Sequence, residues 1–325
     1  MTVRVTHDVR DAVAALRGGG LVALPTETVY GLAGDARSPS AIAGIFAAKG
    51  RPSTHPVIVH LPDAGVIDRW ATAVPHWASS LADALWPGPL TLIVNRADDV
   101  LDAVTGGQPT VGLRVPAHPL TLEVLRQFGD GLAAPSANRY GHVSPTTVEH
   151  VMAELGEVLD AGRDVVLDGG RCPVGVESTI IGAWDDTPRL LRAGAVTALQ
   201  VAEVTGREVS IADGGVRTPG TTAAHYAPTA RVLAVEADAV PDALNEVVGP
   251  FGLIALSNVL VPAIDHVRLA APANAAEYAF ALYAALHAAD DAGLDVVVAV
   301  LPPDAGVGHA VRDRLHRAAI SGARP

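Results

Sequence analysis

Short apolar runs alternate with amphipathic segments along the first half of the chain, and this alternation limits the fold more than any other feature. The spacing of apolar residues predicts helices over 8–18, 40–48, 75–85, 117–128 and 146–155. Strand-like runs occur at 21–24, 57–61, 90–94, 111–115, 131–134 and 165–167. The pattern predicts an α/β or α+β domain with a central sheet.

The alternation of apolar runs and amphipathic segments stops near residue 207. A loop rich in Gly and Pro follows, and we interpret 207–229 as a linker. A second, smaller α/β unit is predicted after it, with strands at 231–235, 251–256 and 295–301 and helices at 274–292 and 309–319. A chain of 325 residues is longer than one average domain. We therefore predict two domains, 1–206 and 230–325.

Charge and composition exclude several classes of protein. The net charge of −12 argues against a general surface for nucleic acid or anionic membrane, because such surfaces neutralise phosphates. No apolar run reaches the roughly 18 residues that span a bilayer, and the N-terminal segment lacks the apolar core of a signal peptide. The single cysteine, Cys172, fits a reducing compartment. We expect a cytoplasmic protein.

Lys49 is the only lysine among 23 basic residues, and its neighbours are unusual. It opens the run Lys49-Gly50-Arg51-Pro52 at the end of the predicted helix 40–48. Two cations held beside Gly and Pro form a fixed positive spot that suits phosphate oxygens. The alternative is a solvated loop, because basic residues also favour the C-terminal end of a helix. No P-loop pattern surrounds Lys49.

Small polar side chains follow several other predicted strands. Ligands of α/β sheets bind at such strand ends. Thr26-Glu27-Thr28 comes after strand 21–24, and Ser136-Ala137-Asn138 comes after strand 131–134. Arg114 lies inside a short apolar strand, where its burial is costly unless it meets an anion such as a carboxylate. Each feature has a structural alternative: a Thr-rich turn, a helix cap, or an edge strand with Arg in water. No metal-ligand motif is present. The combination indicates a pocket in a surface cleft that holds a nucleotide and a small anionic substrate.

Seven ordered motifs resemble the Sua5/YrdC/YwlC family of threonylcarbamoyl-AMP synthases. They are PTETVYGL, KGRP with PVIVH, WPGPLTLIV, VGLRVP, APSAN with SPTT, VEST and LLRAG. The resemblance implies a YrdC-like twisted open sheet with flanking helices, followed by a linker and a smaller Rossmann-like domain. The implied reaction converts L-threonine, bicarbonate or CO2 and ATP with Mg2+ to threonylcarbamoyl-AMP and pyrophosphate. A separate tRNA threonylcarbamoyl transferase machinery would use the product to modify adenosine 37.

The same resemblance implies roles for individual residues. Lys49 and Arg51 would be catalytic. L-Threonine binding would fall to Thr28, His60, Arg114, Ala134 and Ser178. ATP binding would fall to Lys49, Arg51, His55, Thr110, Ser136, Asn138, Ser144, Arg192 and Tyr226. No residue is implied to hold a metal directly. Because one methyl group contributes only about 1–3 kcal/mol of discrimination, serine stays an alternative to threonine.

Some positions depart from the family pattern. His55 stands where Asn is usual, and Ala193 replaces a common Pro. The linker reads TPGTTAAHYAP and keeps only His225 and Tyr226 of the typical central motif. The alternative function is a YrdC-like RNA-binding module without synthase activity, although the acidic charge makes direct tRNA binding unexpected. A hydrogenase-maturation factor would require additional Cys motifs, which are absent.

Overall fold

The computed structural model describes residues 2–211, 216–220, 225–245, 247–262 and 265–321. The chain divides into two compact units. The first comprises Met1–Tyr140, Pro145–Cys172 and Glu177–Thr221, and the second comprises Gly141–Ser144, Pro173–Val176 and Thr222–Pro325. The two four-residue segments belong to the second unit although the first unit flanks them in sequence, and no local pattern in the sequence marks them.

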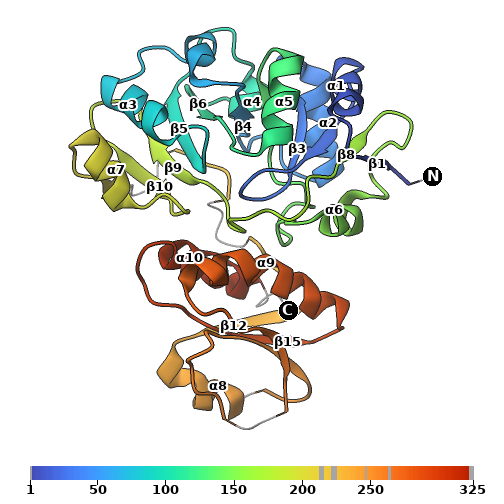
Figure 1. Cartoon of the computed structure of the whole chain (residues 1–325), viewed down its shortest axis with the longest axis vertical. Coiled ribbons are helices and arrows are strands. Elements are labelled where there is room, and N and C mark those ends of the chain that lie inside the picture. Colours follow the sequence, from blue (N-terminus) through green and yellow to red (C-terminus); the bar gives the residue numbers. More distant parts are fainter. Residues whose placement is uncertain (1, 212–215, 221–224, 246, 263–264, 322–325) are drawn as a thin grey trace. The chain divides into compact units, whose positions relative to one another are not determined.

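The first unit contains a mixed sheet of eleven strands in the order β1-β8-β2-β3-β7-β4-β6-β5-β9-β10-β11 (Figure 1). The strands are β1 (Arg4–Thr6), β2 (Val22–Leu24), β3 (Gly31–Asp35), β4 (Ile58–His60), β5 (Leu90–Asn95), β6 (Thr110–Arg114), β7 (Leu132–Ala133), β8 (Val165–Leu167), β9 (Thr179–Gly182), β10 (Arg189–Arg192) and β11 (Ser210–Ile211). The pair β4 and β6 is parallel, and so is the pair β5 and β9. The C-terminal ends within each pair therefore lie at one edge.

The helices of this unit are α1 (Val9–Arg17), α2 (Pro39–Lys49), α3 (His76–Leu85), α4 (Asp102–Thr105), α5 (Pro119–Phe128), α6 (Val148–Leu155) and α7 (Ala198–Thr205), with a 3-10 turn η1 (Ala64–Arg69). Helix α2 begins where the Ser38 side chain accepts a hydrogen bond from the amide of Ala41. It ends at Gly50, whose φ of 60° lies in the left-handed region that favours glycine. This turn fixes the direction in which the chain leaves Lys49.

The core fills both faces of the sheet. Val22 and Leu24 of β2 pack with residues of α1 and α5, which lie side by side in Figure 1. The alternate residues Leu21 and Ala23 belong to a larger cluster that also contains buried side chains of α2, α3 and α6. Successive strand residues point to opposite faces, so a nearly continuous apolar run is what a sheet covered on both sides requires.

The second unit is a parallel four-stranded sheet with helices, which confirms the predicted Rossmann-like α/β architecture. The strand order is β12-β15-β13-β14. Its elements are β12 (Arg231–Val235), η2 (Ala237–Ala239), α8 (Val240–Asn245), β13 (Phe251–Ile254), β14 (Val267–Ala270), α9 (Ala275–Asp291), β15 (Val296–Val300) and α10 (Gly308–Ser321). No described helix in either unit is long and apolar enough to cross a membrane.

All the predicted helices and strands are present, with ends that differ by a few residues. The sequence patterns missed β1, β3, β9, β10, β14, α4, α7 and α8. Strand β11 lies inside the predicted linker, while positions 212–215 and 221–224 of that linker lie outside the described residues. Strand β3 has the sequence GLAGD, whose two glycines are typical of a turn, and its place between β2 and β7 overrides that local preference.

Candidate active site

Lys49, at the C-terminal end of α2, is buried with only 3% of its surface exposed. Its Nζ donates a hydrogen bond to the backbone carbonyl of Ser136 at 2.6 Å and another to the carbonyl of Asn138. No described carboxylate lies within ion-pair distance of this ammonium. Burial lowers the pKa of Lys49 well below its ordinary value, and the nearby Arg51 lowers it further. The expectation of a surface cleft was therefore wrong for the Lys49 side chain, which is enclosed by the backbone that follows β7.

Arg51 and His55 gather around Tyr140. The Arg51 guanidinium lies 5.7 Å from the centre of the Tyr140 ring, and its Nη2 donates to the carbonyl of Pro56 at 2.8 Å. The Tyr140 hydroxyl and His55 Nδ1 are 3.3 Å apart, and the two rings meet edge to face. Burial lowers the pKa of His55, and the charges of Arg51 and Arg217 lower it further. The backbone amide of Tyr140 donates to the carbonyl of Lys49, which ties this cluster to the end of α2.

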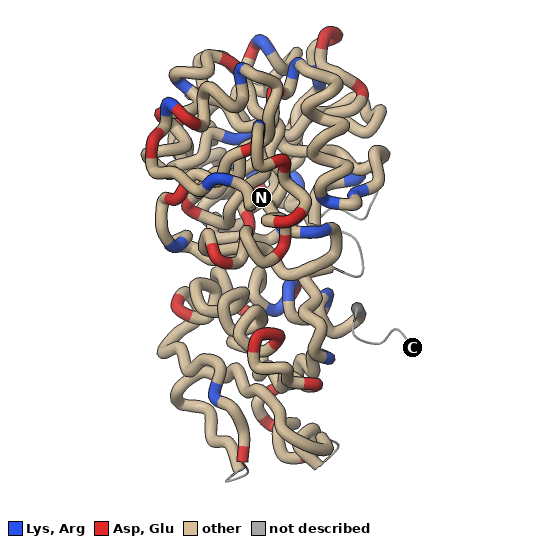
Figure 2. The backbone as a smooth tube through the Cα atoms, turned by 90° about the vertical axis from the view of Figure 1, so that its right-hand side faces the viewer, with Lys and Arg blue, Asp and Glu red and all other residues tan. Residues whose placement is uncertain are grey.

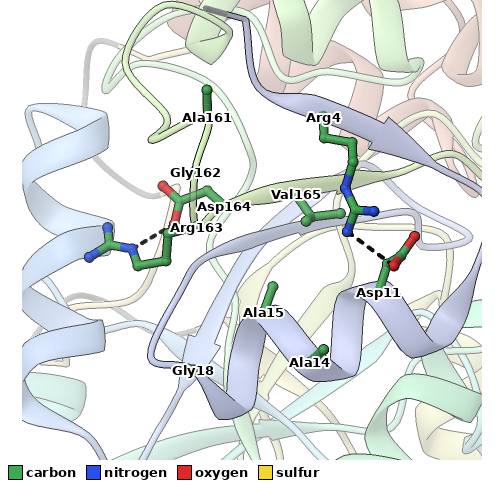
Figure 3. A pocket seen from close by; sticks show the side chains of 10 residues that line it. All are labelled: Arg4, Asp11, Ala14, Ala15, Gly18, Ala161, Gly162, Arg163, Asp164 and Val165. Atoms are coloured by element: carbon green, nitrogen blue, oxygen red, sulfur yellow. Dashed lines mark hydrogen bonds and ion pairs between the residues drawn. The ribbon is translucent and has the colours of Figure 1, made fainter.

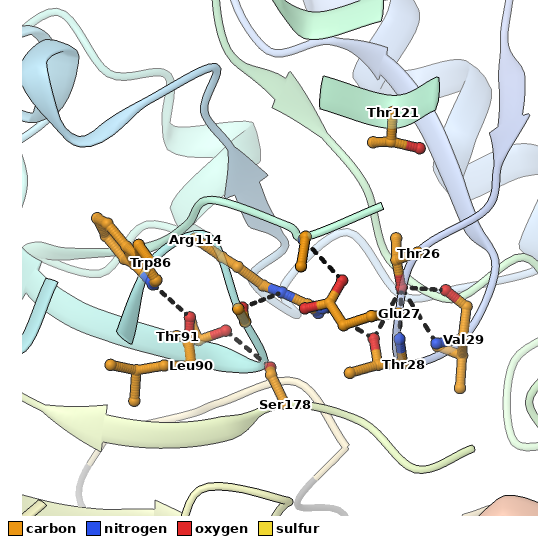
Figure 4. Close-up of polar contacts among 12 residues, drawn as sticks. Thr26, Glu27, Thr28, Val29, Trp86, Leu90, Thr91, Arg114, Thr121 and Ser178 are labelled. Atoms are coloured by element: carbon orange, nitrogen blue, oxygen red, sulfur yellow. Dashed lines mark hydrogen bonds and ion pairs between the residues drawn. The ribbon is translucent and has the colours of Figure 1, made fainter. Parts of the chain in front are cut away.

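Arg114, the last residue of β6, is buried against a carboxylate of the same chain (Figure 4). Its Nη2 donates to Glu27 Oε1 at 2.6 Å and to Thr28 Oγ1 at 3.0 Å, and its Nε donates to the carbonyl of Gly88 at 3.3 Å. The Thr28 hydroxyl also contacts the hydroxyl of Thr26 at 2.8 Å. The structure thus brings the segment after β2 onto the C-terminal end of β6.

His60, the last residue of β4, stands next to Arg114 in the parallel register of β4 and β6. The side chain is buried, and neither Nδ1 nor Nε2 has a hydrogen-bond partner within the part of the chain that the structure describes. Burial lowers the pKa of His60 well below its ordinary value, with Arg114 as the second cause. A buried polar ring without hydrogen-bond partners is costly, which makes His60 a candidate ligand-binding residue. The nearby amide of Ala134 is already used, since it donates to the carbonyl of Ile58 at 3.0 Å.

Ser178 and Arg192 form a second buried cluster at β9 and β10. The Ser178 hydroxyl contacts the hydroxyl of Thr91 at 2.8 Å (Figure 4). Arg192 Nη2 donates to the carbonyl and the hydroxyl of Ser178 at 2.9 and 3.1 Å. Its Nη1 donates to the carbonyl of Pro219 at 2.9 Å. Arg192 therefore links Ser178, which is expected to bind threonine, to the chain segment that follows β11.

The remaining predicted residues lie in different places. Ser136 and Asn138 contact Lys49 through their backbone carbonyls. Thr110 begins β6 whereas Arg114 ends it, which separates them by roughly 13 Å at about 3.3 Å per residue. Ser144 and Tyr226 belong to the second unit, where the Tyr226 ring lies 5.8 Å from the ring of Tyr283.

Three contributors to the site were not predicted. Glu27 was quoted within its motif but received no role, although it pairs with Arg114. Thr91 and Tyr140 also received none, although they contact Ser178 and His55. A useful signal existed only for Glu27, because a lone carboxylate between two threonines complements an arginine set in an apolar strand.

A cavity of about 360 Å³ lies elsewhere in the first unit, beside α1 and β8 (Figure 3). Its charged lining consists of two ion pairs, Arg4 with Asp11 and Arg163 with Asp164, each with an N–O distance of 3.1 Å. None of the residues predicted for the active site lines this cavity. This cavity is therefore separate from the candidate active site.

Comparisons with known proteins point in one direction. A family model described as "Telomere recombination" matches residues 14–194, and one described as "Threonylcarbamoyl-AMP synthase, C-terminal domain" matches residues 196–320. A Bacillus subtilis protein named threonylcarbamoyl-AMP synthase is 37% identical, over 96% of this chain and 92% of its own length. A Pyrococcus abyssi protein of the same name is 35% identical, over 95% and 93%.

A solved structure agrees with these matches. The crystal structure of P. abyssi Sua5 complexed with L-threonine superposes with a TM-score of 0.86 at 32% identity. The superposition covers 99% of this chain and 98% of the other. Both units therefore have counterparts in one protein.

Proposed function

This chain belongs to the Sua5 family of threonylcarbamoyl-AMP synthases, and from this premise we propose that it is an L-threonylcarbamoyladenylate synthase. The family predicted from the seven motifs is thereby confirmed. The proposed reaction joins L-threonine, bicarbonate or CO2 and ATP and releases pyrophosphate, so that the protein acts as a nucleotidyltransferase. Its product would serve a separate tRNA threonylcarbamoyl transferase machinery.

The single observation that carries this proposal is the environment of Lys49. Lys49 is a buried amine whose described partners are two neutral carbonyls, so its charged form is uncompensated inside the protein and its pKa is lowered. Such a charge is costly unless an anion neutralises it. Arg51, two residues along the chain, adds a second cation to the same place. A triphosphate supplies the anion that this arrangement needs.

The chemistry requires little from the protein beyond position and charge. The threonine amine forms an N–C bond with CO2 and loses a proton, which gives a carbamate. A carbamate oxygen then bonds to the α-phosphorus of ATP, and the bond from that phosphorus to the bridging oxygen breaks. Negative charge grows on the departing pyrophosphate, where Lys49 and Arg51 would stabilise it.

The threonine end of the site would be the cluster at the ends of β4 and β6. Arg114 and Thr28 offer donors to a carboxylate, and His60 offers a buried ring nitrogen without a partner in the described structure. Ser178 and the backbone carbonyl of Ala134, whose amide already donates to the carbonyl of Ile58, would complete these contacts. His55, Thr110, Ser136, Asn138, Ser144, Arg192 and Tyr226 remain the residues proposed for ATP.

Mg2+ would arrive with the nucleotide. Among the described residues, no group of three or more His, Cys, Asp or Glu side chains is arranged to hold a metal ion. Mg2+ commonly keeps several waters and binds through substrate phosphates. We propose MgATP as the substrate, with Lys49 and Arg51 beside the phosphates that would carry the ion.

The alternative of an RNA-binding module is not favoured. Basic and acidic segments are interspersed in the view of Figure 2, and the chain carries a net charge of −12. Nucleic-acid surfaces instead concentrate Lys and Arg on one face. A gel-shift assay with tRNA over a range of salt concentrations distinguishes the two functions. Salt-sensitive tRNA binding without synthase activity would favour the RNA-binding module over the synthase.

Pyrophosphate release tests the proposal. We expect release only when ATP, bicarbonate and L-threonine are all present, with omission of any one abolishing it. Release that continues without threonine would identify an ATP pyrophosphohydrolase instead. Lys49→Met provides the matched inactive protein, which excludes a contaminating activity.

A further inference from the structure

Glu27 and Arg114 form a buried ion pair inside the candidate threonine site (Figure 4). The exposed fraction of Arg114 is 4% and that of Glu27 is 7%. No other charged side chain forms an ion pair with either of them among the described residues. The positive charge assigned to carboxylate recognition is therefore already compensated within the protein.

One donor group of Arg114, Nη1, is not used by the hydrogen bonds that its guanidinium makes within the described structure. Nε is used by the carbonyl of Gly88, and Nη2 is used by Glu27 and Thr28. Nη1 makes no hydrogen bond to any described residue. A ligand carboxylate can therefore reach the guanidinium through Nη1, whereas the two-point approach through Nη2 is blocked by Glu27.

Glu27 is held in place by more than Arg114. Its Oε2 accepts a hydrogen bond from the backbone amide of Ala117 at 2.9 Å, on the chain that continues from β6. The carboxylate thus has a fixed position whether or not a ligand engages Arg114. Its charge stays in the site during binding.

Neighbouring titratable groups add little charge near neutral pH. His60 stands beside Arg114 in the sheet register, and burial lowers its pKa well below the ordinary value. His118 follows Ala117, and burial lowers the pKa of His118 as well. Burial also raises the pKa of the Cys172 thiol, which feels the charge of Glu27, to about 12. The charges of Arg114 and Glu27 therefore cancel each other at the end of β6, while Arg192 places a further cation on the Ser178 side of the site.

We propose that Glu27 is a specificity-determining residue that cancels the charge of Arg114 and limits it to one free donor group, so that the site selects amino acids with uncharged side chains. The inference rests on the proposed function, because it takes the amino acid to be the ligand of Arg114. An acidic amino acid would bring a second carboxylate against Glu27, and Arg114 could not compensate it because the charge of Arg114 is already paired. L-Aspartate is the sharpest probe, since it is close to threonine in size and differs mainly in charge.

The test measures by calorimetry how strongly L-asparagine and L-aspartate compete with L-threonine for binding to the full chain. In the wild type we expect L-asparagine to compete at least about tenfold more strongly than its charged isostere L-aspartate. Glu27→Gln should strengthen L-aspartate binding by about tenfold relative to L-threonine binding, because Arg114 is then uncompensated. Glu27→Asp keeps the charge and should retain the wild-type preference.

Several outcomes would overturn the inference. Equal competition by L-asparagine and L-aspartate in the wild type would do so, as would competition by neither. An unchanged preference in folded Glu27→Gln would do so too, and if that variant does not fold, the wild-type comparison decides. Glu236→Gln is the matched control, since it removes a carboxylate from the ion pair with Arg312 in the second unit. Wild-type product formation from threonine, measured separately, shows whether the function itself has failed.

Discussion

Replacing Lys49 with methionine separates the two roles that a buried ammonium can have. Met is unbranched and of similar length, so it removes the charge and the donors with little change in packing. The carbonyls of Ser136 and Asn138 lose their bonds to Nζ. The variant therefore asks whether Lys49 supports the fold or the reaction.

The structure predicts opposite magnitudes for stability and for turnover. Hydrogen bonds from a charged donor contribute about 1.5–3 kcal/mol each, so the two lost bonds cost about 3–6 kcal/mol. The folded variant no longer holds a buried ammonium without a carboxylate partner, a state that costs several kcal/mol. These changes offset each other, and we expect the free energy of unfolding to move by less than about 2 kcal/mol. Loss of a group that stabilises transition-state charge lowers kcat by about 10²–10³-fold.

Two measurements on the same protein check this prediction. Urea unfolding gives the free energy of unfolding, and initial rates of pyrophosphate release at saturating substrates give kcat. Arg126→Met, at the exposed end of α5, is the matched control and should leave both values unchanged. A Lys49→Met protein that keeps more than about a tenth of wild-type kcat would refute the assigned role.

Three further predictions concern stability and local order. Burial lowers the pKa of His60 below its ordinary value of 6.5, so the unfolded chain binds more protons than the folded protein at a pH between the two values. The free energy of unfolding therefore rises with pH in the window between the folded pKa and 6.5. Urea unfolding at pH 7 and pH 5 should show wild type losing up to about 1.4 kcal/mol per pH unit from this residue, and His60→Asn should lose less. Gln108→Ala removes two hydrogen bonds to the backbone of Arg217, at 2.9 and 2.8 Å, and should speed amide exchange at Arg217 by about tenfold; unchanged exchange counts against this anchor. Gly131→Ala places a Cβ 2.6 Å from Trp70 Cζ2 and should destabilise the protein by about 1–3 kcal/mol in urea unfolding, whereas a neutral result would show that the indole can shift.

Local pattern was sufficient for the elements that form the core. The apolar runs at 21–24 and 111–115 and the spacing of 8–18 correspond to β2, β6 and α1, because burial against the sheet agrees with local preference there. The sequence gives no such agreement for β3, whose glycines suit a turn. Local preference and burial also disagree for β14, whose first two residues, Val267 and Arg268, are exposed.

The site was predictable in composition and less so in geometry. The pattern placed Lys49 at a helix end and His60 near a strand end, as the structure does, whereas Arg114 was expected inside a strand and is the last residue of β6. The partners of these residues lie far away in sequence. Glu27 is 87 positions from Arg114, and the carbonyls that enclose Lys49 are 87 and 89 positions away. Such pairings depend on the strand order of the sheet, which no local pattern encodes.

The measurement that bears most directly on the proposed synthase is mass spectrometry of the products formed from ATP, bicarbonate and an amino-acid panel. The account predicts threonylcarbamoyl-AMP and pyrophosphate in equal amounts when L-threonine is present, and at least about a hundredfold less adduct in the same time when Lys49 is replaced by methionine. Formation of AMP or pyrophosphate without a carbamoylated adduct would contradict it.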